Sequence, residues 1–427
     1  MTEGTPKLTA RLRSFCQTVS RSRSEHWLAA IALLSLSVNL AFFSQRAGFG
    51  IEPTDQREYY ELAVSIYEGQ GFFDGFWLAH RPPLYPYWMA AVFKMSGAPS
   101  RDVILLLQAV LGGITCLLIA WLGAHLLDRS TGFLAGVTAA LYPALPWYAT
   151  FVLYETLYVF LTAALLCALH LWSRAGRKLW AIAVGMLLGL MLLAHGKTFL
   201  LLPFVLCYML WRGARQLRQT ITGIGLATLA MILVCSPWVY RNYRLFERFV
   251  PINTSGGLIA YQAYNPHDPA LLDHSQPALK RELASLSEPP GDEIAMSQLG
   301  YRLASKWILL HPWQTIQLLA HKARLFLDPR IEPNPILGLA YAAVSLASFL
   351  GMVILWPSKG NQRSVLALLS VPIAWTAAAN ILSLVLYRYR LPMLPSLAVL
   401  SAVALVRGVT ALLNTRGGLS VDAGTHS

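Results

Sequence analysis

The residues best suited to chemistry in this sequence are one acid and a group of cations, each near the end of an apolar segment. The acid is Asp55, which lies about a dozen residues beyond the first apolar run. The cations are Arg81, Lys197, Arg241, Arg388 and Arg390. Clustered cations bind an anion such as a lipid phosphate through charge-assisted hydrogen bonds. A carboxylate facing them would be a natural general base.

Each of these residues also has a purely structural interpretation. The stretch PTDQRE places Thr54 or Asp55 where a helix start needs a short hydrogen-bond acceptor, so Asp55 could be an N-cap. A single cation could extend to lipid headgroups, or pair with a loop carboxylate such as Glu52, Glu58 or Asp74. The sequence leaves both interpretations open, but several cations of this kind together favour an anionic ligand.

The composition indicates what kind of molecule must position these residues. Of 427 residues, 56% are hydrophobic and only 13% are charged, with a mean hydropathy of +0.49. A soluble protein would carry about a quarter charged residues, so we predict an all-α polytopic membrane protein. Basic loops explain the formal net charge of +13, and we expect no nucleic-acid partner. The cysteines form no CxxC motif and no ligand spacing, which argues against a zinc site.

About ten apolar segments are near the length of a transmembrane helix. They are residues 27–43, 103–126, 132–148, 151–172, 179–194, 198–211, 220–236, 336–356, 365–386 and 393–408. The basic clusters fall on one side of the membrane if all ten cross and both termini are cytoplasmic. In that topology Asp55 and the cations face outward. The pair within 179–211 is short, and either two short helices or a re-entrant pair would place Lys197 towards the outer side.

This topology divides the chain into three parts. We predict a basic cytoplasmic tail at 1–26, a membrane domain at 27–408, and a disordered cytoplasmic tail at 409–427. Two outer loops, at about 44–102 and 237–335, should cap the bundle, and both contain helix-like stretches. In DQREYYELAVSIYEGQ the apolar residues lie on one helical face, which suits the membrane surface.

One further carboxylate, Glu155, lies near the outer end of an early helix, in YETLYVF. A carboxylate at that depth is unfavourable unless it is paired or hydrated. It could orient a cation, pair with an arginine, or help Asp55 hold a divalent metal, which His80 or His195 could join. We favour pairing and leave metal dependence open. The sequence has no Gly-rich phosphate loop, so no nucleotide is expected.

The order of four short motifs resembles the GT-C superfamily of integral-membrane glycosyltransferases. These motifs are the lone acid after the first apolar helix, RPPLYP closing the first outer loop, PWVYRNY entering the second, and RYRLP near the C-terminus. Within that superfamily the chain is similar to the branch of lipid A aminoarabinose transferases and protein O-mannosyltransferases. Gln56 stands where mannosyltransferases commonly have Glu, and Glu58 replaces an Arg of the aminoarabinose transferases. The motifs therefore assign neither substrate.

The resemblance implies roles for particular residues. Asp55 matches the acid of the family, and Arg81 matches the cation before the paired prolines. Further cations that it places near the donor phosphate are Lys197, Arg241, Arg388 and Arg390. Supporting positions are Tyr59, Tyr85, Glu155 and Tyr387.

The resemblance also implies an activity. A protein of this type would move a hexosyl or pentosyl group from a polyprenyl-monophosphate donor to a hydroxyl of a glycan, lipid or protein acceptor, with inversion. It would be an integral enzyme of the plasma (inner) membrane, active on the outer face and serving the cell envelope. The alternative is a transporter or flippase for lipid-phosphate-linked sugars. That protein would also gather cations, but along a central path and often with internal repeats.

Overall fold

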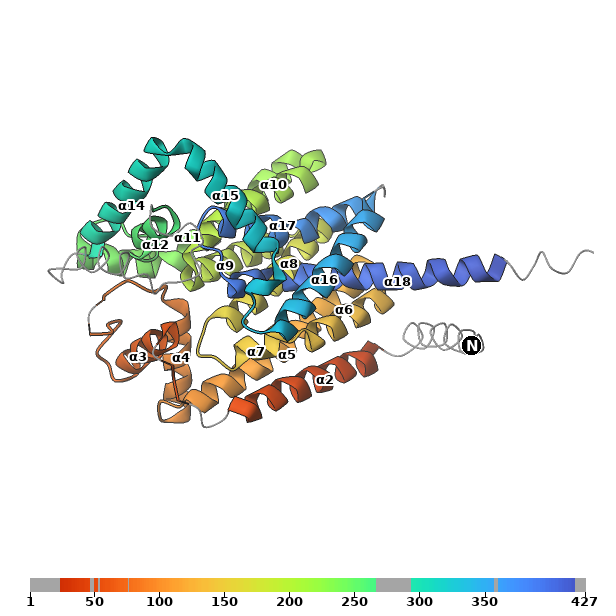
Figure 1. The fold of residues 1–427 in the computed structure, drawn as a ribbon, viewed down its shortest axis with the longest axis horizontal. Coiled ribbons are helices and arrows are strands. Elements are labelled where there is room, and N and C mark those ends of the chain that lie inside the picture. The colour runs from red at the N-terminus through yellow and green to blue at the C-terminus, as the bar shows by residue number, and fades with distance from the viewer. Residues whose placement is uncertain are drawn as a thin grey trace, which may run out of the picture.

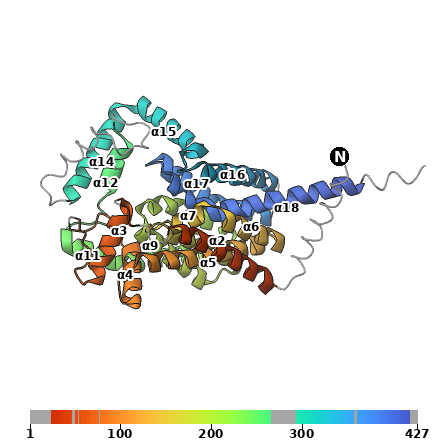
Figure 2. The ribbon, with the colours of Figure 1, turned by 60° about the horizontal axis from the view of Figure 1, so that its bottom comes forward.

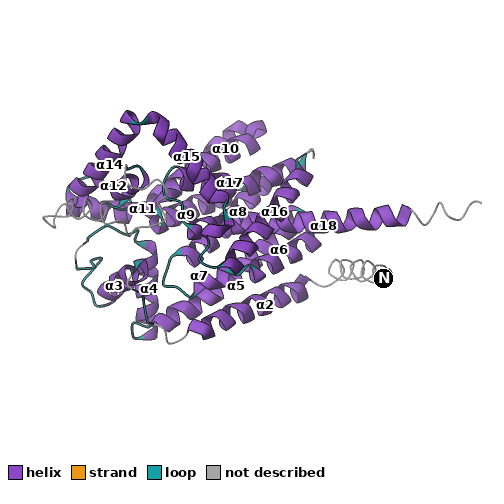
Figure 3. Ribbon diagram, in the orientation of Figure 1, coloured by secondary structure: helices purple, strands orange, loops and turns teal. Residues whose placement is uncertain are grey.

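A computed structural model describes residues 24–46, 50–52, 54–75, 77–265, 293–356 and 360–418. Throughout these ranges the regular structure is helical, without a strand (Figures 1 and 3). This confirms the predicted all-α class. Residues 1–23 of the basic tail and 419–427 of the C-terminal tail lie outside the described residues.

Seven of the described helices are long and apolar enough to cross a membrane. They are α2 (Ser24–Arg46), α5 (Arg101–Leu126), α8 (Glu155–Ala175), α11 (Leu217–Phe246), α16 (Pro335–Leu355), α17 (Asn361–Ile381) and α18 (Leu394–Gly418). Large apolar side chains such as Leu229 and Leu339 are exposed on them, as expected of positions that face lipid. Helix α18 continues past residue 408, where we had placed the end of the membrane domain, so the first part of the tail predicted to be disordered is helical.

The predicted count of ten crossings is not confirmed, because three of the ten segments form shorter helices in the described part of the chain. These helices are α6 (Arg129–Leu141), α9 (Lys178–Ala194) and α10 (Leu202–Arg212). Helix α6 ends early because a proline follows two residues later. Tyr142 takes the extended conformation that a residue before proline prefers, and Pro143 then precedes the short helix α7 (Ala144–Ala149).

Helices α9 and α10 are joined by the 3-10 turn η1 (Gly196–Leu201) and run between the same two ends of the bundle. Helix α9 begins just after Gly176, and α10 ends just before Gly213. Gln219 of α11 donates a hydrogen bond of 2.8 Å to the carbonyl of Gly176, and its neighbour Thr220 donates one of 2.9 Å to that of Gly213. The far ends of the two helices therefore lie together, as both two short transits and a re-entrant pair require.

The first outer loop contains α3 (Asp55–Tyr67) and α4 (Leu84–Ser96). The predicted amphipathic helix is therefore present. Its apolar face does not lie open to the membrane surface, however, because Tyr59, Leu62 and Ala63 are buried against neighbouring protein. Helix α3 is thus fixed to the bundle, which gives its first residues a defined position.

The second outer loop begins later than predicted, because α11 continues through Pro237 to Phe246. It contains α12 (Gly256–Ala263), α14 (Glu293–Leu310), α15 (Pro312–Leu327) and the short turn η3 (Pro329–Ile331). Helices α14 and α15 form an inverted V above α12 in Figure 1, and Figure 2 shows both outer loops at one end of the bundle, away from the C-terminal end of α18. Two more short turns are η2 (Ala214–Gln216) and η4 (Tyr387–Met393). Residues 266–292 of this loop lie outside the described residues.

Candidate active site

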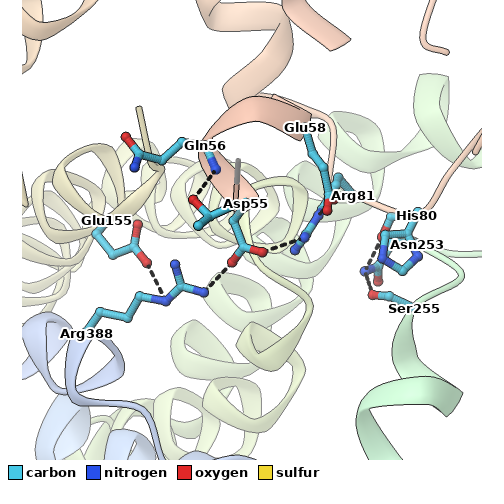
Figure 4. A network of polar contacts seen from close by, with 10 residues as sticks. Asp55, Gln56, Glu58, His80, Arg81, Glu155, Asn253, Ser255 and Arg388 are labelled. Atoms are coloured by element: carbon cyan, nitrogen blue, oxygen red, sulfur yellow. Dashed lines mark hydrogen bonds and ion pairs between the residues drawn. The ribbon is translucent and has the colours of Figure 1, made fainter. Parts of the chain in front are cut away.

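Asp55 is the first residue of α3, and its carboxylate joins two arginines from distant parts of the chain (Figure 4). Thr54 is the N-cap of α3 and accepts a hydrogen bond from the backbone N–H of Gln56, so Asp55 is not needed as the cap. Arg81 donates to Oδ1 of Asp55 through Nη2 at 2.7 Å, and Arg388 donates to Oδ2. The structure therefore replaces the N-cap interpretation with an ion pair on each side of the carboxylate.

Arg81 is held by two acids of α3. Its Nε donates to Glu58 at 2.7 Å, and its guanidinium carbon lies 5.5 Å from the centre of the Tyr59 ring. Pro82 and Pro83 follow directly, and Pro83 is the residue before α4. The two prolines fix the direction of the chain at this point. The Arg81 side chain remains 20% exposed, so it is anchored but still accessible to a ligand.

Arg388 comes from η4, more than 300 residues along the chain from Asp55, and links it to the start of α8. Its Nε lies 3.4 Å from Oε1 of Glu155, which is 3% exposed. The guanidinium also lies over the ring of Tyr389. Pairing with an arginine, the interpretation that we favoured for Glu155, is therefore what the structure contains.

Metal ligation finds no support in the described part of the chain, where no group of three or more His, Cys, Asp or Glu residues could hold a metal ion. The His80 ring stacks on Trp77. Burial and the charge of Arg81 lower the pKa of His80 to about 3, so this imidazole is neutral at physiological pH.

Opposing influences act on the ionisation of Asp55. Burial raises the pKa of its carboxyl, but the charges and hydrogen bonds of Arg81 and Arg388 outweigh burial and lower the pKa to about 2. Asp55 is therefore ionised at any physiological pH. With both arginines in place it is also a weak base.

Lys197 of η1 lines the same cavity as Asp55 and both arginines. Its Nζ donates a hydrogen bond of 3.2 Å to the carbonyl of Leu384 and lies 3.9 Å from the centre of the Tyr389 ring. Among the described residues no carboxylate pairs with it. Burial and the charges of Arg388 and Lys322 lower the pKa of Lys197, so an anion in the cavity would stabilise its ammonium form.

Arg241 and Arg390, two of the five predicted phosphate-binding cations, are not in this cavity. Arg241 donates to the backbone carbonyls of Phe72 and Leu78, and thereby holds the first outer loop against α11. Arg390 is only 2% exposed and pairs with Glu332 at 3.0 Å. Both are engaged in holding protein segments together, so we leave them out of the phosphate site.

The supporting tyrosines have separate places. Tyr59 lines the cavity beside Arg81. Tyr85 is buried and donates a hydrogen bond of 2.7 Å to Gln108, away from the cavity. Tyr387 stacks on Tyr148. Of these three tyrosines, Tyr59 alone lines the cavity.

The cavity has a volume of about 450 Å³ and lies between the two outer loops. One wall carries the charged groups described above. The apolar and second-loop residues of the other walls include Phe199, Leu200, Phe249, Asn253, Thr254, Ser255, Ile294, Ser297 and Tyr301. A ligand with an anionic group and an apolar part would find a matching surface for each.

A chamber with aromatic walls adjoins this cavity and shares Arg388, Lys197 and Tyr389 with it. Several buried polar atoms on its walls lack a hydrogen-bond partner among the described residues. They are the Tyr154 hydroxyl, both carboxylate oxygens of Glu155, His195 Nε2, Thr376 Oγ1 and Asn380 Oδ1. Buried polar groups are normally satisfied, so this set indicates a place that receives a polar ligand or water. Except for Glu155 and His195, sequence analysis did not select these residues.

Lys322 is a buried lysine that sequence analysis missed. It is 0% exposed and donates to the carbonyls of Ala263 at 2.9 Å and Ser383 at 2.8 Å. Ser383 belongs to the segment between α17 and η4, where Lys197 holds the next carbonyl. Lys322 therefore ties α15 to the segment that leads to Arg388. The helical spacing of buried positions along α15 could have revealed it.

Glu293, at the start of α14, links the two outer loops beside Arg81. It accepts hydrogen bonds from the backbone N–H groups of Leu78 and Ala79 and from the Thr254 hydroxyl. Thr254 in turn donates its backbone N–H to the carbonyl of Ala79 at 2.9 Å. The second outer loop thus positions the chain that carries Arg81, which no sequence motif indicated.

Comparison with solved structures establishes the fold. The archaeal oligosaccharyltransferase of Archaeoglobus fulgidus, solved with an inhibitory peptide and a dolichol-phosphate, matches with a TM-score of 0.60 over 94% of this chain and 52% of that protein, at 14% identity. The chain resembles the GT-C glycosyltransferases. It spans about half the length of that protein, and a match at this identity concerns the fold alone.

Sequence comparison identifies the branch of GT-C glycosyltransferases that the chain resembles. Residues 80–240 match the dolichyl-phosphate-mannose-protein mannosyltransferase family. The undecaprenyl phosphate-alpha-4-amino-4-deoxy-L-arabinose arabinosyl transferase of Pseudomonas aeruginosa is 28% identical over 235 residues, which are 51% of this chain and 40% of that enzyme. The predicted resemblance to aminoarabinose transferases and protein mannosyltransferases is therefore confirmed.

Proposed function

We propose that the protein is a glycosyltransferase that moves a sugar from a polyprenyl-monophosphate donor to an acceptor hydroxyl, with inversion at C1. The observation that carries this proposal is the ion cluster of Asp55, Arg81 and Arg388 in a cavity that Lys197 also lines. The matched family and the relative carry dolichyl phosphate and undecaprenyl phosphate in their names, which supports the same class of donor here.

The cations of the cavity suit the phosphate of such a donor. A guanidinium group binds phosphate oxygens in a bidentate manner, and an ammonium group acts as a compact point charge. In the described chain Lys197 has no carboxylate partner and donates to the carbonyl of Leu384, so an incoming anion competes there with a neutral acceptor. Phe199, Leu200 and Phe249 on the same cavity offer apolar surface to the first isoprene units.

In the proposed reaction the acceptor oxygen attacks C1 of the sugar from the face opposite the phosphate. The bond between C1 and the phosphate oxygen breaks, and its electron pair stays on the phosphate. A new C1–O bond forms to the acceptor, whose hydroxyl proton passes to Asp55. The donor phosphodiester thereby becomes a monoester with additional negative charge. Preplaced cations stabilise that charge more in the transition state than in the ground state.

The two arginines couple proton transfer to departure of the phosphate. They hold the pKa of Asp55 at about 2 in the resting site. As negative charge grows on the phosphate, Arg81 and Arg388 turn their hydrogen bonds towards it. Burial is then the main influence left on Asp55, and burial raises the pKa of a carboxyl. Asp55 thus becomes a stronger base at the step that needs one.

We assign the transferred sugar to the part of the 450 Å³ cavity beside Arg388 and Tyr389, because the adjoining aromatic chamber, with about 20 Å³, has room for about one water. The unpartnered polar atoms of the chamber, such as Tyr154 Oη and Asn380 Oδ1, suit a water that bridges them to a sugar hydroxyl. With the sugar beside Arg388, C1 would lie next to the phosphate. Turnover of polyprenyl-phosphate hexoses against pentoses distinguishes the two classes of sugar.

The orientation follows from charge. The loops rich in arginine and lysine lie at the far ends of α8 and α10, and such loops stay in the cytoplasm. The active site is then on the outer face of the plasma (inner) membrane. The acceptor, a glycan, lipid or protein, would approach from that side through the second outer loop.

A transfer assay with purified protein tests the proposal. The wild type is given polyprenyl-phosphate hexoses and pentoses with envelope acceptors, and release of polyprenyl phosphate is followed. Lys197→Gln should lower kcat/KM by about 10²–10³. The control Lys94→Gln changes an exposed lysine at the end of α4 and should leave kcat/KM unchanged. If the wild type binds these donors and moves them between leaflets without releasing polyprenyl phosphate, the transporter alternative replaces the proposal.

A further inference from the structure

A second pair of cavities lies at the end of the bundle remote from Asp55. Helix α8 begins with Glu155 at the active site and ends at Ala175, and its 21 residues extend about 31 Å. That length equals the thickness of the hydrocarbon core of a bilayer, roughly 30 Å. Gly176, just beyond α8, lines a cavity of about 440 Å³ and an adjoining one of about 550 Å³. We call the two together the basal groove.

The basal groove is lined by cations and no acid. Its basic residues are Arg174, Arg212 and Arg215 in the first cavity and Lys178 and Arg218 in the second. No Asp or Glu lines either cavity, and none of these five side chains forms an ion pair with a carboxylate in the described part of the chain. The Nε atom of Arg212 is buried without a hydrogen-bond partner there. The groove therefore holds concentrated positive charge that is not balanced locally.

The groove is held in shape by contacts between its two loops. Gln219 donates a hydrogen bond of 2.8 Å to the carbonyl of Gly176, and Thr220 donates to that of Gly213 at 2.9 Å. Gly176 has a positive φ of 60°, and a Cβ there would lie 2.3 Å from the Gln219 side chain. At the floor, Trp172 is only 5% exposed. These contacts indicate a built pocket, whereas the positive-inside rule alone would need only scattered loop charges.

Exposed apolar side chains lie beside the groove, on the surface of the bundle that would face lipid. Leu179, Trp211, Leu217 and Ile221 are each about half exposed or more. Their positions put a charged hollow next to a surface that would face acyl chains. A ligand with an anionic headgroup and hydrocarbon tails satisfies both, whereas a free phosphate would leave the apolar flank without a role.

We propose that the basal groove binds the phosphodiester headgroup of an anionic phospholipid of the inner leaflet. Arg174, Arg212 and Arg215 would hold the phosphate, with the acyl chains along the apolar flank. Arg212 would gain the partner that its buried Nε lacks. This site is separate from the sugar-transfer site and does not depend on the proposed function.

Native mass spectrometry of the full chain, delipidated in detergent, tests this site. The probes are phosphatidylglycerol, phosphatidylcholine with the same acyl chains, and glycerol 3-phosphate as a soluble competitor. We expect the first bound molecule of phosphatidylglycerol to have a Kd at least tenfold lower than that of the first bound molecule of phosphatidylcholine. Arg212→Gln should weaken that step about tenfold, as loss of one charge-assisted hydrogen bond implies. The matched control is Arg177→Gln, an exposed arginine of the same loop that does not line the groove.

Three results would overturn the proposal. Equal affinity for the two lipids would mean that the groove does not recognise the charge of the headgroup. An equal loss in Arg177→Gln and Arg212→Gln would mean a diffuse positive face without a site. Displacement of the lipid by glycerol 3-phosphate at similar concentration would assign the groove to a soluble phosphate instead. Because Arg212 is partly buried, the exposed Arg174→Gln and Arg215→Gln variants provide the same test if Arg212→Gln fails to fold.

Discussion

Replacing Arg388 by glutamine should destabilise the protein, and a second substitution at Glu155 should recover most of the loss. The Arg388 Nε atom lies 3.4 Å from a carboxylate oxygen of Glu155, which is 3% exposed. Removing the arginine leaves this buried carboxylate without a counter-charge, which costs about 3–5 kcal/mol. In Arg388→Gln/Glu155→Gln neither charge of that pair remains, and Asp55, which also loses Arg388, keeps its ion pair with Arg81, so the free energy of unfolding should return to within about 1.5 kcal/mol of wild type.

Unfolding in detergent micelles, followed by tryptophan fluorescence, measures this double-mutant cycle. The control Arg330→Gln removes an arginine that is 88% exposed and pairs with Asp328 at the surface, where an ion pair is worth about 0–1 kcal/mol. Transfer activity should be low in both variants that lack Arg388, whatever their stability, because both have lost a phosphate-binding group. We expect the double variant to be stable but at least 10²-fold less active.

Two outcomes would refute the reasoning behind this cycle. If Arg388→Gln is as stable as wild type, Glu155 does not depend on Arg388 for its charge compensation. If the double variant regains activity together with stability, Arg388 acts only through folding and has no place in the phosphate site.

Three further predictions follow from the same contacts. Lys322→Met should keep the helix content but lower kcat far more than donor affinity, because the carbonyl of Ser383, on the segment before Arg388, and that of Ala263, in α12, lose their donor. Steady-state kinetics over a range of donor concentrations measures both constants, and a rise in KM with kcat unchanged would contradict this prediction. The pKa of Asp55 is lowered from 3.8 to about 2, so its stabilising contribution is complete above about pH 4 and disappears as pH falls towards 2. Unfolding experiments should therefore show the stability difference between wild type and Asp55→Asn shrinking over that range, and a constant difference would contradict the ion-pair assignment. Arg390→Gln should lower the unfolding temperature, and the folded fraction should keep the wild-type KM for the donor. Lys197→Gln should raise the KM for the donor and leave the unfolding temperature unchanged.

Much of the candidate site could be predicted from sequence because its residues are anomalies. An arginine or lysine at the outer end of an apolar helix contradicts the positive-inside rule and demands a reason. Arg81, Lys197 and Arg388 meet at the cavity with Asp55, as that reasoning anticipated. The long helices were equally readable, since length and hydropathy define them locally.

A basic residue at the outer end of an apolar helix does not by itself show which group it binds in the folded protein. Arg241 and Arg390 occupy similar junctions but bind backbone carbonyls and Glu332, and only the folded chain brings those groups to them. Glu293 and Lys322 were missed for the same reason, since their partners are mostly main-chain atoms with no sequence signature. Short helices such as α6 depend on where a proline stops them, which a hydropathy window does not resolve.

In the proposed reaction Asp55 accepts a proton while cations hold the departing phosphate. The most direct test compares wild type, Asp55→Asn and the matched control Glu61→Gln, which alters an exposed acid of the same helix, in release of polyprenyl phosphate from saturating donor. Donor binding is measured in parallel. We predict that Asp55→Asn binds donor at least as well as wild type but releases polyprenyl phosphate at least 10²-fold more slowly, while Glu61→Gln matches wild type. Release by Asp55→Asn at the wild-type rate would contradict the account, because a group that cannot take the proton would then be sufficient for transfer.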